Sequence, residues 1–83
     1  MLRLDQLPPC RPARIAAIDW ARLPVAQARR MRELGFDEGV GVEALHHGPI
    51  RRDPIALRIG RMTVAIRRAQ AAAIQVVEAV AAE

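Results

Sequence analysis

The residue types that most often carry chemistry are sparse in this sequence and poorly spaced for catalysis. Thr63 is the only serine or threonine, and no histidine lies near it in the sequence. The nine acidic residues are scattered, without a matched pair for acid–base work. A glycine-rich phosphate-binding loop is also missing. We therefore predict no catalytic residues, no cofactor and no enzymatic activity.

His46, His47 and Cys10 are the remaining candidates for metal binding or covalent chemistry. Adjacent residues on a strand point to opposite faces, so His46 and His47 would rarely bind one ion together. No Cys-x-x-Cys or spaced His/Glu set completes a site. We predict two solvated histidines, with one of them as an adventitious ligand as the alternative, and no metal site. Cys10, the only cysteine, is predicted to be a half-buried filler and cannot form an internal disulfide, which suits a reducing cytoplasm.

Arginine dominates the charge of the chain. All 13 basic residues are arginine, and the formal net charge is +4. This balance favours an acidic partner, which could be a nucleic acid, an anionic membrane surface or an acidic protein face. One Trp, one Phe and no Tyr argue against single-stranded nucleic acid, which usually stacks on several aromatic side chains. The arginines at 29, 30 and 32 form either a solvated helix face or a docking surface, and the pairs at 51–52 and 67–68 would extend it if the fold brings them close.

A helix is predicted to position the first of these arginines. Apolar residues recur at three-residue steps from Val25 to Leu34, so they share one helical face, and Pro24 suits the first turn. Gly35 then follows the last apolar position. Because glycine adopts a positive φ without steric penalty, we expect the helix to end there and Phe36 to enter the core. An alternative is that this helix end borders an apolar groove. The predicted partner-binding residues are Arg29, Arg30, Arg32, Leu34, Gly35 and Phe36.

The rest of the chain is predicted to form short strands. Alternating apolar residues indicate strands at 11–20, 40–45, 55–59, 62–66 and 74–77, after a short extended segment at 2–4. Within the first long strand, the spacing of Ile15 and Ile18 predicts either a bulge or an inward Ala17. Asp19 is a candidate cap for the entry to the helix. Gly60-Arg61 is predicted to form a type II′ turn, residues 46–54 a long polar loop, and residues 67–73 a single helical turn.

These elements predict a mostly β fold with short helices, a small SH3-like β-barrel with a helix inserted after the first long strand. The 83 residues suffice for one domain, placed at 1–77, with a C-terminal tail at 78–83. No apolar run approaches the roughly 20 residues that span a bilayer. The start of the chain also lacks the apolar segment of a signal peptide. We therefore expect a soluble cytoplasmic protein.

Three stretches of the sequence resemble one known family. The run Arg-Arg-Met-Arg-Glu-Leu-Gly-Phe-Asp-Glu-Gly-Val, at 29–40, resembles the signature of the ferrous iron transport protein A (FeoA) family. Residues 52–55 and 64–71 also resemble that family, and the resemblance spans Leu2 to Val77. The family usually has a glycine where Cys10 stands, so this chain departs from the family pattern at its first turn.

The resemblance implies both a fold and a function. It implies an SH3-like barrel that serves as an accessory or regulatory protein of bacterial ferrous iron uptake and binds the GTPase-bearing membrane permease, FeoB. Activation, inhibition and assembly of the transporter all stay open as its role. Two other functions are alternatives: a small nucleic-acid-binding barrel, or a stand-alone relative of the SH3-like domain of metal-dependent repressors. The chain has no helix-turn-helix, so it could not be a whole repressor.

Overall fold

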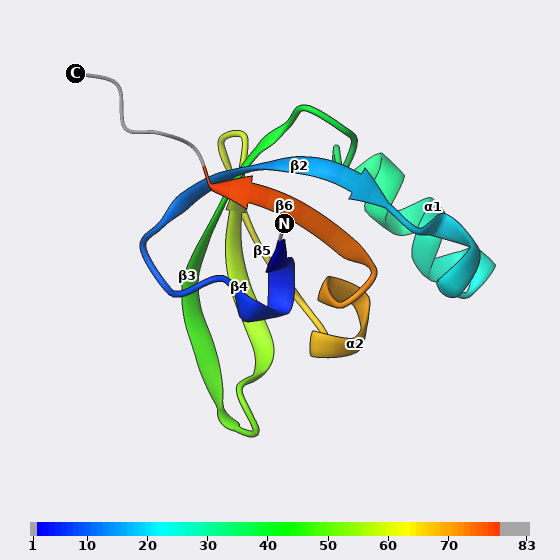
Figure 1. Cartoon of the computed structure of the whole chain (residues 1–83). Helices are drawn as coiled ribbons and strands as arrows, with labels where there is room; N and C mark the ends of the chain where they lie inside the picture. Colours follow the sequence, from blue (N-terminus) through cyan, green and yellow to red (C-terminus); the bar gives the residue numbers. More distant parts are fainter. Residues whose placement is uncertain (1, 79–83) are drawn as a thin grey trace.

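A single antiparallel sheet organises the computed structural model, which describes residues 2–78 (Figure 1). Its six strands are hydrogen-bonded in the order β1-β6-β2-β3-β4-β5. They are β1 (Leu2–Arg3), β2 (Pro12–Ile18), β3 (Gly41–Ile50), β4 (Asp53–Ile59), β5 (Met62–Ile66) and β6 (Ile74–Glu78). The mostly β fold predicted from the sequence is confirmed, but β1 and β5 are not paired among the described residues. The sheet is therefore not closed into a barrel.

Four short helical segments interrupt the sheet. Two are 3-10 turns, η1 (Leu4–Gln6) and η2 (Trp20–Arg22), and two are α-helical, α1 (Val25–Glu33) and α2 (Arg68–Ala71). In Figure 1, α1 lies at one side of the sheet, beyond the end of β2, and α2 lies beneath β6. The helix predicted after the first long strand and the helical turn predicted before the last strand are both present.

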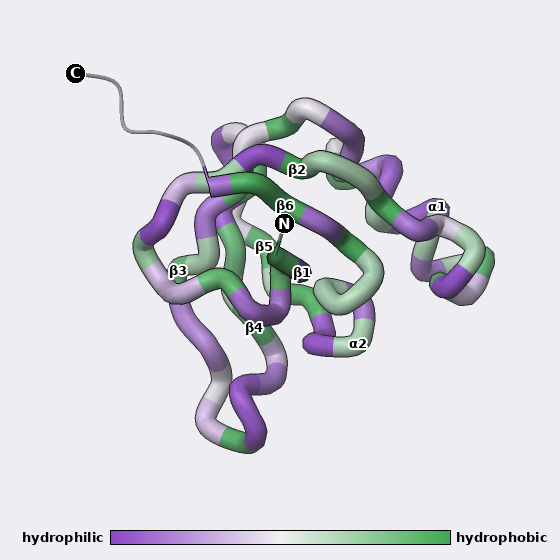
Figure 2. The backbone as a smooth tube through the Cα atoms, viewed as in Figure 1, coloured by the Kyte–Doolittle hydropathy of each residue, from purple (hydrophilic) through white to green (hydrophobic). Residues whose placement is uncertain are grey.

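The hydrophobic core lies inside the curved sheet. Hydrophobic positions alternate with hydrophilic ones along β6 and the first half of β2 (Figure 2), and the buried residues of these strands lie on one face. Among the described residues, no polar or charged residue is buried. The largest fully buried side chains come from η1, β2, α1, β4, β6 and the segments after η1 and α1: Leu4, Leu7, Ile15, Met31, Phe36, Ile55, Leu57, Ile74 and Val76. Residues from near both ends of the described chain therefore pack in the core with residues from its middle.

The helix stop at Gly35 is confirmed. Gly35 has a φ of 102°, and the next residue, Phe36, is only 1% exposed. A Phe36 N–H bond to the Met31 carbonyl (3.0 Å) closes the helix end. The predicted apolar stripe is wrong at its start, because Val25 is 78% exposed while Met31 is 1% exposed. Val25 begins the helix, and the neighbouring Leu23 fills the core instead.

The loop predicted at 46–54 is wrong, because β3 and β4 continue through it as a hairpin. Gly48, Pro49 and Pro54 suggested a loop from the sequence. However, β2 pairs only with residues 41–43 of β3, so the later part of β3 has a free edge. A proline on a free edge interrupts no ladder hydrogen bond. The hairpin turns at Arg51 and Arg52 and projects below the sheet (Figure 1).

Several smaller expectations have mixed outcomes. A bulge lies between Ile15 and Ala17, as one of the two readings predicted. Gly60 has a positive φ and Arg61 does not, as a type II′ turn requires. Asp19 precedes η2 but makes no side-chain capping bond. Cys10 is exposed rather than half-buried, and it lies in a turn with a φ of 67°.

The last strand, predicted at 74–77, continues one residue further, to Glu78. Glu78, where the tail was placed, belongs to β6 and pairs with Ala13 of β2. Its carboxylate lies 3.0 Å from the Arg11 guanidinium. The rest of the predicted tail, 79–83, lies outside the described residues.

Candidate partner-binding surface

The surface around α1 is built on one aromatic side chain and one arginine. Trp20 opens η2, directly before the chain enters α1 at Pro24. The Arg32 guanidinium lies over the Trp20 ring, with its carbon 4.4 Å from the ring centroid. This cation–π contact joins the turn to the last part of the helix. Trp20 is partly buried against the core, so the contact also fixes α1 to the sheet.

Two hollows lie on either side of this contact. The first has a volume of about 470 Å³ and is bordered by Trp20, Leu23, Val25, Ala28, Arg29, Arg32 and Glu33. The second has a volume of about 570 Å³ and is bordered by Trp20, Arg32, Gly35, Phe36, Asp37 and Val40. We call the two together the α1 groove. The groove combines exposed apolar surface, an aromatic ring and arginine, which are the features of protein-binding surfaces.

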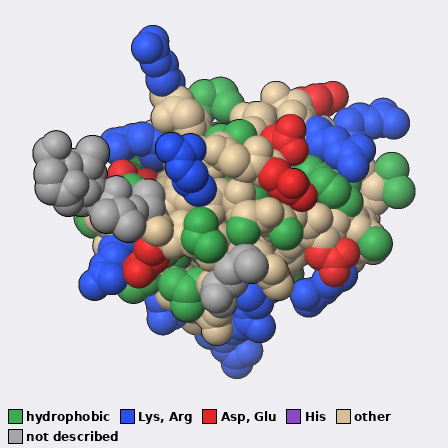
Figure 3. Space-filling view, turned by 45° about the horizontal axis from the view of Figure 1, so that its top comes forward, with side chains coloured by type: hydrophobic (Ala, Val, Ile, Leu, Met, Phe, Trp, Pro, Cys, Tyr) green, Lys and Arg blue, Asp and Glu red, His purple; other side chains and the backbone are tan. Residues whose placement is uncertain are grey.

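The six residues predicted from the sequence differ in their position relative to this groove. Arg29 and Arg32 border it, whereas Arg30 is exposed and borders neither hollow. Leu34 is half-buried against the core, and Gly35 is exposed. The Phe36 side chain is buried, so it shapes the second hollow from below. In the space-filling view, hydrophobic side chains lie beside arginines at the right-hand edge of the molecule (Figure 3).

Sequence reasoning missed Trp20 and Val25 as surface residues. Trp20 is the only tryptophan, and its position just before the predicted helix was the available signal. Its contact with Arg32 joins residues 12 apart through a 3-10 turn, which no helical periodicity indicates. Val25 was assigned to the buried stripe by its spacing alone.

The other basic pairs gather at a different hollow. Its volume is about 470 Å³, and Arg3, Asp5, Arg22, Arg51, Asp53, Arg68, Ala69 and Ala72 border it. The Arg68 side chain donates to the Arg51 carbonyl (2.9 Å), and its backbone N–H donates to the Asp53 carboxylate (2.9 Å). The fold thus joins the pairs at 51–52 and 67–68 to each other. Neither of these pairs borders the α1 groove.

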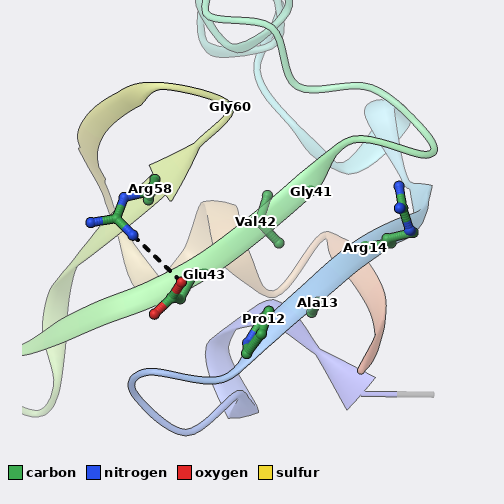
Figure 4. Close-up of a pocket in the computed structure, with 8 residues that line it drawn as sticks. All are labelled: Pro12, Ala13, Arg14, Gly41, Val42, Glu43, Arg58 and Gly60. Atoms are coloured by element: carbon green, nitrogen blue, oxygen red, sulfur yellow. Dashed lines mark ion pairs between the residues drawn. The ribbon is translucent and has the colours of Figure 1, made fainter. Parts of the chain in front are cut away.

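A further hollow opens on the outer side of the sheet (Figure 4). Its volume is about 320 Å³, and it lies where β2, β3 and the end of β4 meet. The Arg58 guanidinium lies 3.6 Å from the Glu43 carboxylate, and this ion pair links β4 to β3. Arg14, at the other side, donates to the Gly39 carbonyl. These charged groups hold strands together, and the lining includes no nucleophile.

The two histidines differ in their surroundings. His46 is exposed, as predicted. His47 is partly buried rather than solvated, because the long β3 strand carries it against the segment after η1. Its Nε2 lies 3.1 Å from the Leu7 carbonyl oxygen, while its buried Nδ1 has no hydrogen-bond partner. Within residues 2–78, no three His, Cys, Asp or Glu residues gather in a way that could hold a metal ion.

The open antiparallel sheet, the inserted helix and the groove beside it define a small protein with an SH3-like fold. The FeoA domain family matches residues 2–78, and the chain therefore belongs to the FeoA family. This family is associated with ferrous iron transport and is not a known enzyme family. No curated protein sequence matches the chain. Of the described helices, none has the length and apolar character needed to cross a membrane.

Solved structures agree with this assignment. The FeoA protein from Chlorobium tepidum has 26% identity and a TM-score of 0.83, over 99% of this chain and 74% of that chain. The FeoA from Stenotrophomonas maltophilia, described as a prokaryotic SH3 domain protein and complexed with zinc, has 30% identity and a TM-score of 0.77, over 92% and 89%. Iron(II) transport protein A from Clostridium thermocellum has 28% identity and a TM-score of 0.79, over 90% and 44%.

Proposed function

We propose that this chain is a non-enzymatic cytoplasmic accessory protein of bacterial ferrous iron uptake. In this proposal it binds the GTPase-bearing membrane permease, FeoB, through the α1 groove. Membership of the FeoA family supports the link to iron transport. The single observation that favours the α1 groove is the Arg32–Trp20 contact, which lies between two hollows on the surface.

The composition of the groove supports its use as a protein-binding surface. Trp and Arg are enriched among the residues that dominate binding energies at interfaces. Here they are pre-organised, since the guanidinium already lies over the ring in the free chain. Val25 adds apolar area that is 78% exposed. A partner helix or loop with an apolar ridge and acidic flanks would fit this groove.

Leu34, Gly35 and Phe36 have a supporting role in this proposal. Phe36 is buried below the second hollow, and the positive φ of Gly35 directs it there. These residues set the position of the helix end that carries Arg32. The arginines at 29 and 32 are then the residues that contact the partner, and Arg30 contributes charge at the edge.

Co-purification of the chain with the permease, with and without guanine nucleotide, tests the proposal. We expect the permease to retain the wild-type chain in at least one nucleotide state. A double variant, Arg29→Gln with Arg32→Gln, should be retained much less, although it folds. Absence of retention in every nucleotide state would contradict the proposed partner, whereas full retention of the double variant would contradict the proposed surface.

A further inference from the structure

We propose that the tip of the β3–β4 hairpin and the arginines around it form a docking surface for an anionic lipid bilayer. We call this surface the arginine face and define it by Arg3, Arg22, Arg51, Arg52, Arg67 and Arg68. The lipid phosphates would be bound by the guanidinium groups, and the hairpin tip would enter the headgroup layer. This inference does not depend on the permease.

The backbone of the hairpin tip is the first observation. Arg51 and Arg52 form the two-residue turn, and both have left-handed backbones, with φ of 56° and 63°. Two consecutive residues with positive φ form a type I′ turn, for which Asn-Gly is strongly preferred. Arginine carries a Cβ that disfavours this conformation. The chain thus has two long cationic side chains at positions where asparagine and glycine would make the turn more stable. Such strain is a reason to look for a function.

Exposed apolar surface at the same tip is the second observation. Ile50, directly before the turn, is 74% exposed. Figure 2 shows a hydrophobic stretch at the tip, flanked by hydrophilic chain. An apolar side chain next to arginines is the composition of protein segments that lie in the interface of a membrane. The guanidiniums would contact phosphates while the isoleucine lies among the upper acyl chains.

The hairpin is held in place rather than loosely attached. A Cβ on Gly48 would overlap the Asp53 carbonyl on the opposite strand, so the two strands lie unusually close there. Arg68 of α2 bonds to the Arg51 carbonyl, and the Arg67 guanidinium lies 3.9 Å from the Asp53 carboxylate. These contacts connect the tip to the body of the protein and orient the arginine face.

Charge is the third observation. The arginine face has six arginines, and the two acidic residues among them are Asp5 and Asp53. Its net charge of +4 equals that of the whole sequence, because the other seven arginines are balanced by seven acidic residues. Within residues 2–78, Arg22, Arg51 and Arg52 make no ion pair. Free guanidinium groups at one end of the molecule are complementary to a surface rich in phosphate.

A bilayer explains this end of the molecule better than a soluble ligand does. A free phosphate or an acidic peptide would pair with the arginines but would leave Ile50 in water. A lipid surface satisfies both the arginines and the isoleucine, and it is flat enough to contact a projecting tip and the hollow behind it together.

Vesicle co-sedimentation of the purified chain tests the proposal. We expect binding to vesicles that contain phosphatidylglycerol in phosphatidylcholine, loss of that binding at high salt, and no binding to phosphatidylcholine alone. Equal binding to both kinds of vesicle, or to neither, would overturn the proposal. Submillimolar binding of inorganic phosphate by calorimetry, with no binding to vesicles, would identify a soluble ligand instead and would also overturn it.

A double variant separates function from folding. Arg51→Asn with Arg52→Gly introduces the residues that a type I′ turn prefers, so we expect the melting temperature to rise by about 4–8 °C. At about fivefold for each arginine, vesicle binding should fall by about 25-fold. A more stable protein that binds vesicles as well as the wild type would contradict the proposal.

Three single variants complete the test. Arg61→Gln is the matched control for Arg51→Gln, because both arginines lie in two-residue hairpin turns. Arg51→Gln should weaken vesicle binding about fivefold and Arg61→Gln by less than about twofold. Ile50→Ser keeps every charge, and we expect about tenfold weaker binding if the side chain enters the bilayer. Equal effects of the two arginine variants, or no effect of Ile50→Ser, would overturn the proposed orientation.

Discussion

The α1 groove and the arginine face both present arginines to solvent, yet they are built in different ways. In the α1 groove, a single guanidinium is stacked on an aromatic ring, and buried apolar residues support the helix from below. In the arginine face, the tip is a strained turn, the two strands behind it approach closely, and hydrogen bonds to α2 hold it in place. Arginine content alone therefore does not define a site. The contacts that hold each arginine in place determine which kind of partner it can bind.

This difference predicts that the two regions respond to different kinds of substitution. Loss of buried volume should be the most damaging kind of change at the α1 groove, whereas crowding between the two strands should be the most damaging kind at the hairpin. Unfolding by heat or denaturant, together with binding, distinguishes the two kinds of damage.

Phe36→Ala should have the largest effect on stability. The side chain is only 1% exposed and is among the largest fully buried side chains of the described residues. Truncation of a buried phenylalanine costs about 3–5 kcal/mol of unfolding free energy. Chemical denaturation measures this loss. A loss below about 1 kcal/mol would mean that the helix end does not depend on the core. It would contradict the statement that buried apolar residues support the α1 groove.

Met31→Ala and Val25→Ala form a matched pair within α1. Met31 is the one buried residue of the helix, and its truncation should cost about 2–5 kcal/mol. Val25→Ala should change stability by less than about 0.5 kcal/mol, because the side chain is exposed, but it should weaken partner binding. Similar melting temperatures for the two variants would show that the buried face of α1 is misassigned.

Gly48→Ala tests the hairpin side of the comparison. The added Cβ would overlap the Asp53 carbonyl and lie 2.9 Å from the Pro54 nitrogen, both backbone atoms of the opposite strand. Separating the strands should cost about 1–3 kcal/mol, as overpacking does elsewhere. The same variant should weaken vesicle binding more than it weakens permease binding. An unchanged melting temperature would contradict the close approach of β3 and β4.

Gly35→Ala should have a smaller effect on stability and a larger one on function. No atom lies within 4 Å of the added Cβ, so only backbone strain at a φ of 102° opposes the substitution. We expect a loss of about 1 kcal/mol and a folded protein. A shifted helix end would move Arg32 and reduce iron-dependent growth. Full iron uptake by the folded variant would separate this turn from function.

Local signals made the α1 end largely predictable from the sequence. A glycine directly after the last apolar helix position, followed by the only phenylalanine, indicated both the helix stop and the buried anchor. The strands at 55–59 and 62–66 followed from alternation and the Gly60 turn. The assumption that equal spacing means equal burial was wrong. Val25 lies at the start of the helix and is exposed, and Leu23 occupies the core position that the spacing assigned to Val25.

Non-local contacts explain what the sequence did not predict. The hairpin over 46–54 contains residues typical of loops. Pro49 is accepted because it lies at the irregularity between His47 and Ile50 on the free edge of β3, and Pro54 because it precedes the residues of β4 that pair with β5. No sequence rule predicts an Arg-Arg type I′ turn. Likewise, the stack of Arg32 on Trp20 and the convergence of Arg22 with Arg51 and Arg68 depend on how distant elements pack.

The affinity of the chain for the permease, measured in nanodiscs of phosphatidylcholine alone, tests the central claim most directly. Neutral lipid removes any contribution from the arginine face, so only protein contacts remain. We expect Arg29→Gln with Arg32→Gln to weaken binding by at least about tenfold, as loss of interface arginines does elsewhere. Arg51→Asn with Arg52→Gly should change it by less than about twofold. The reverse order of effects would contradict the assignment of the α1 groove as the partner-binding surface.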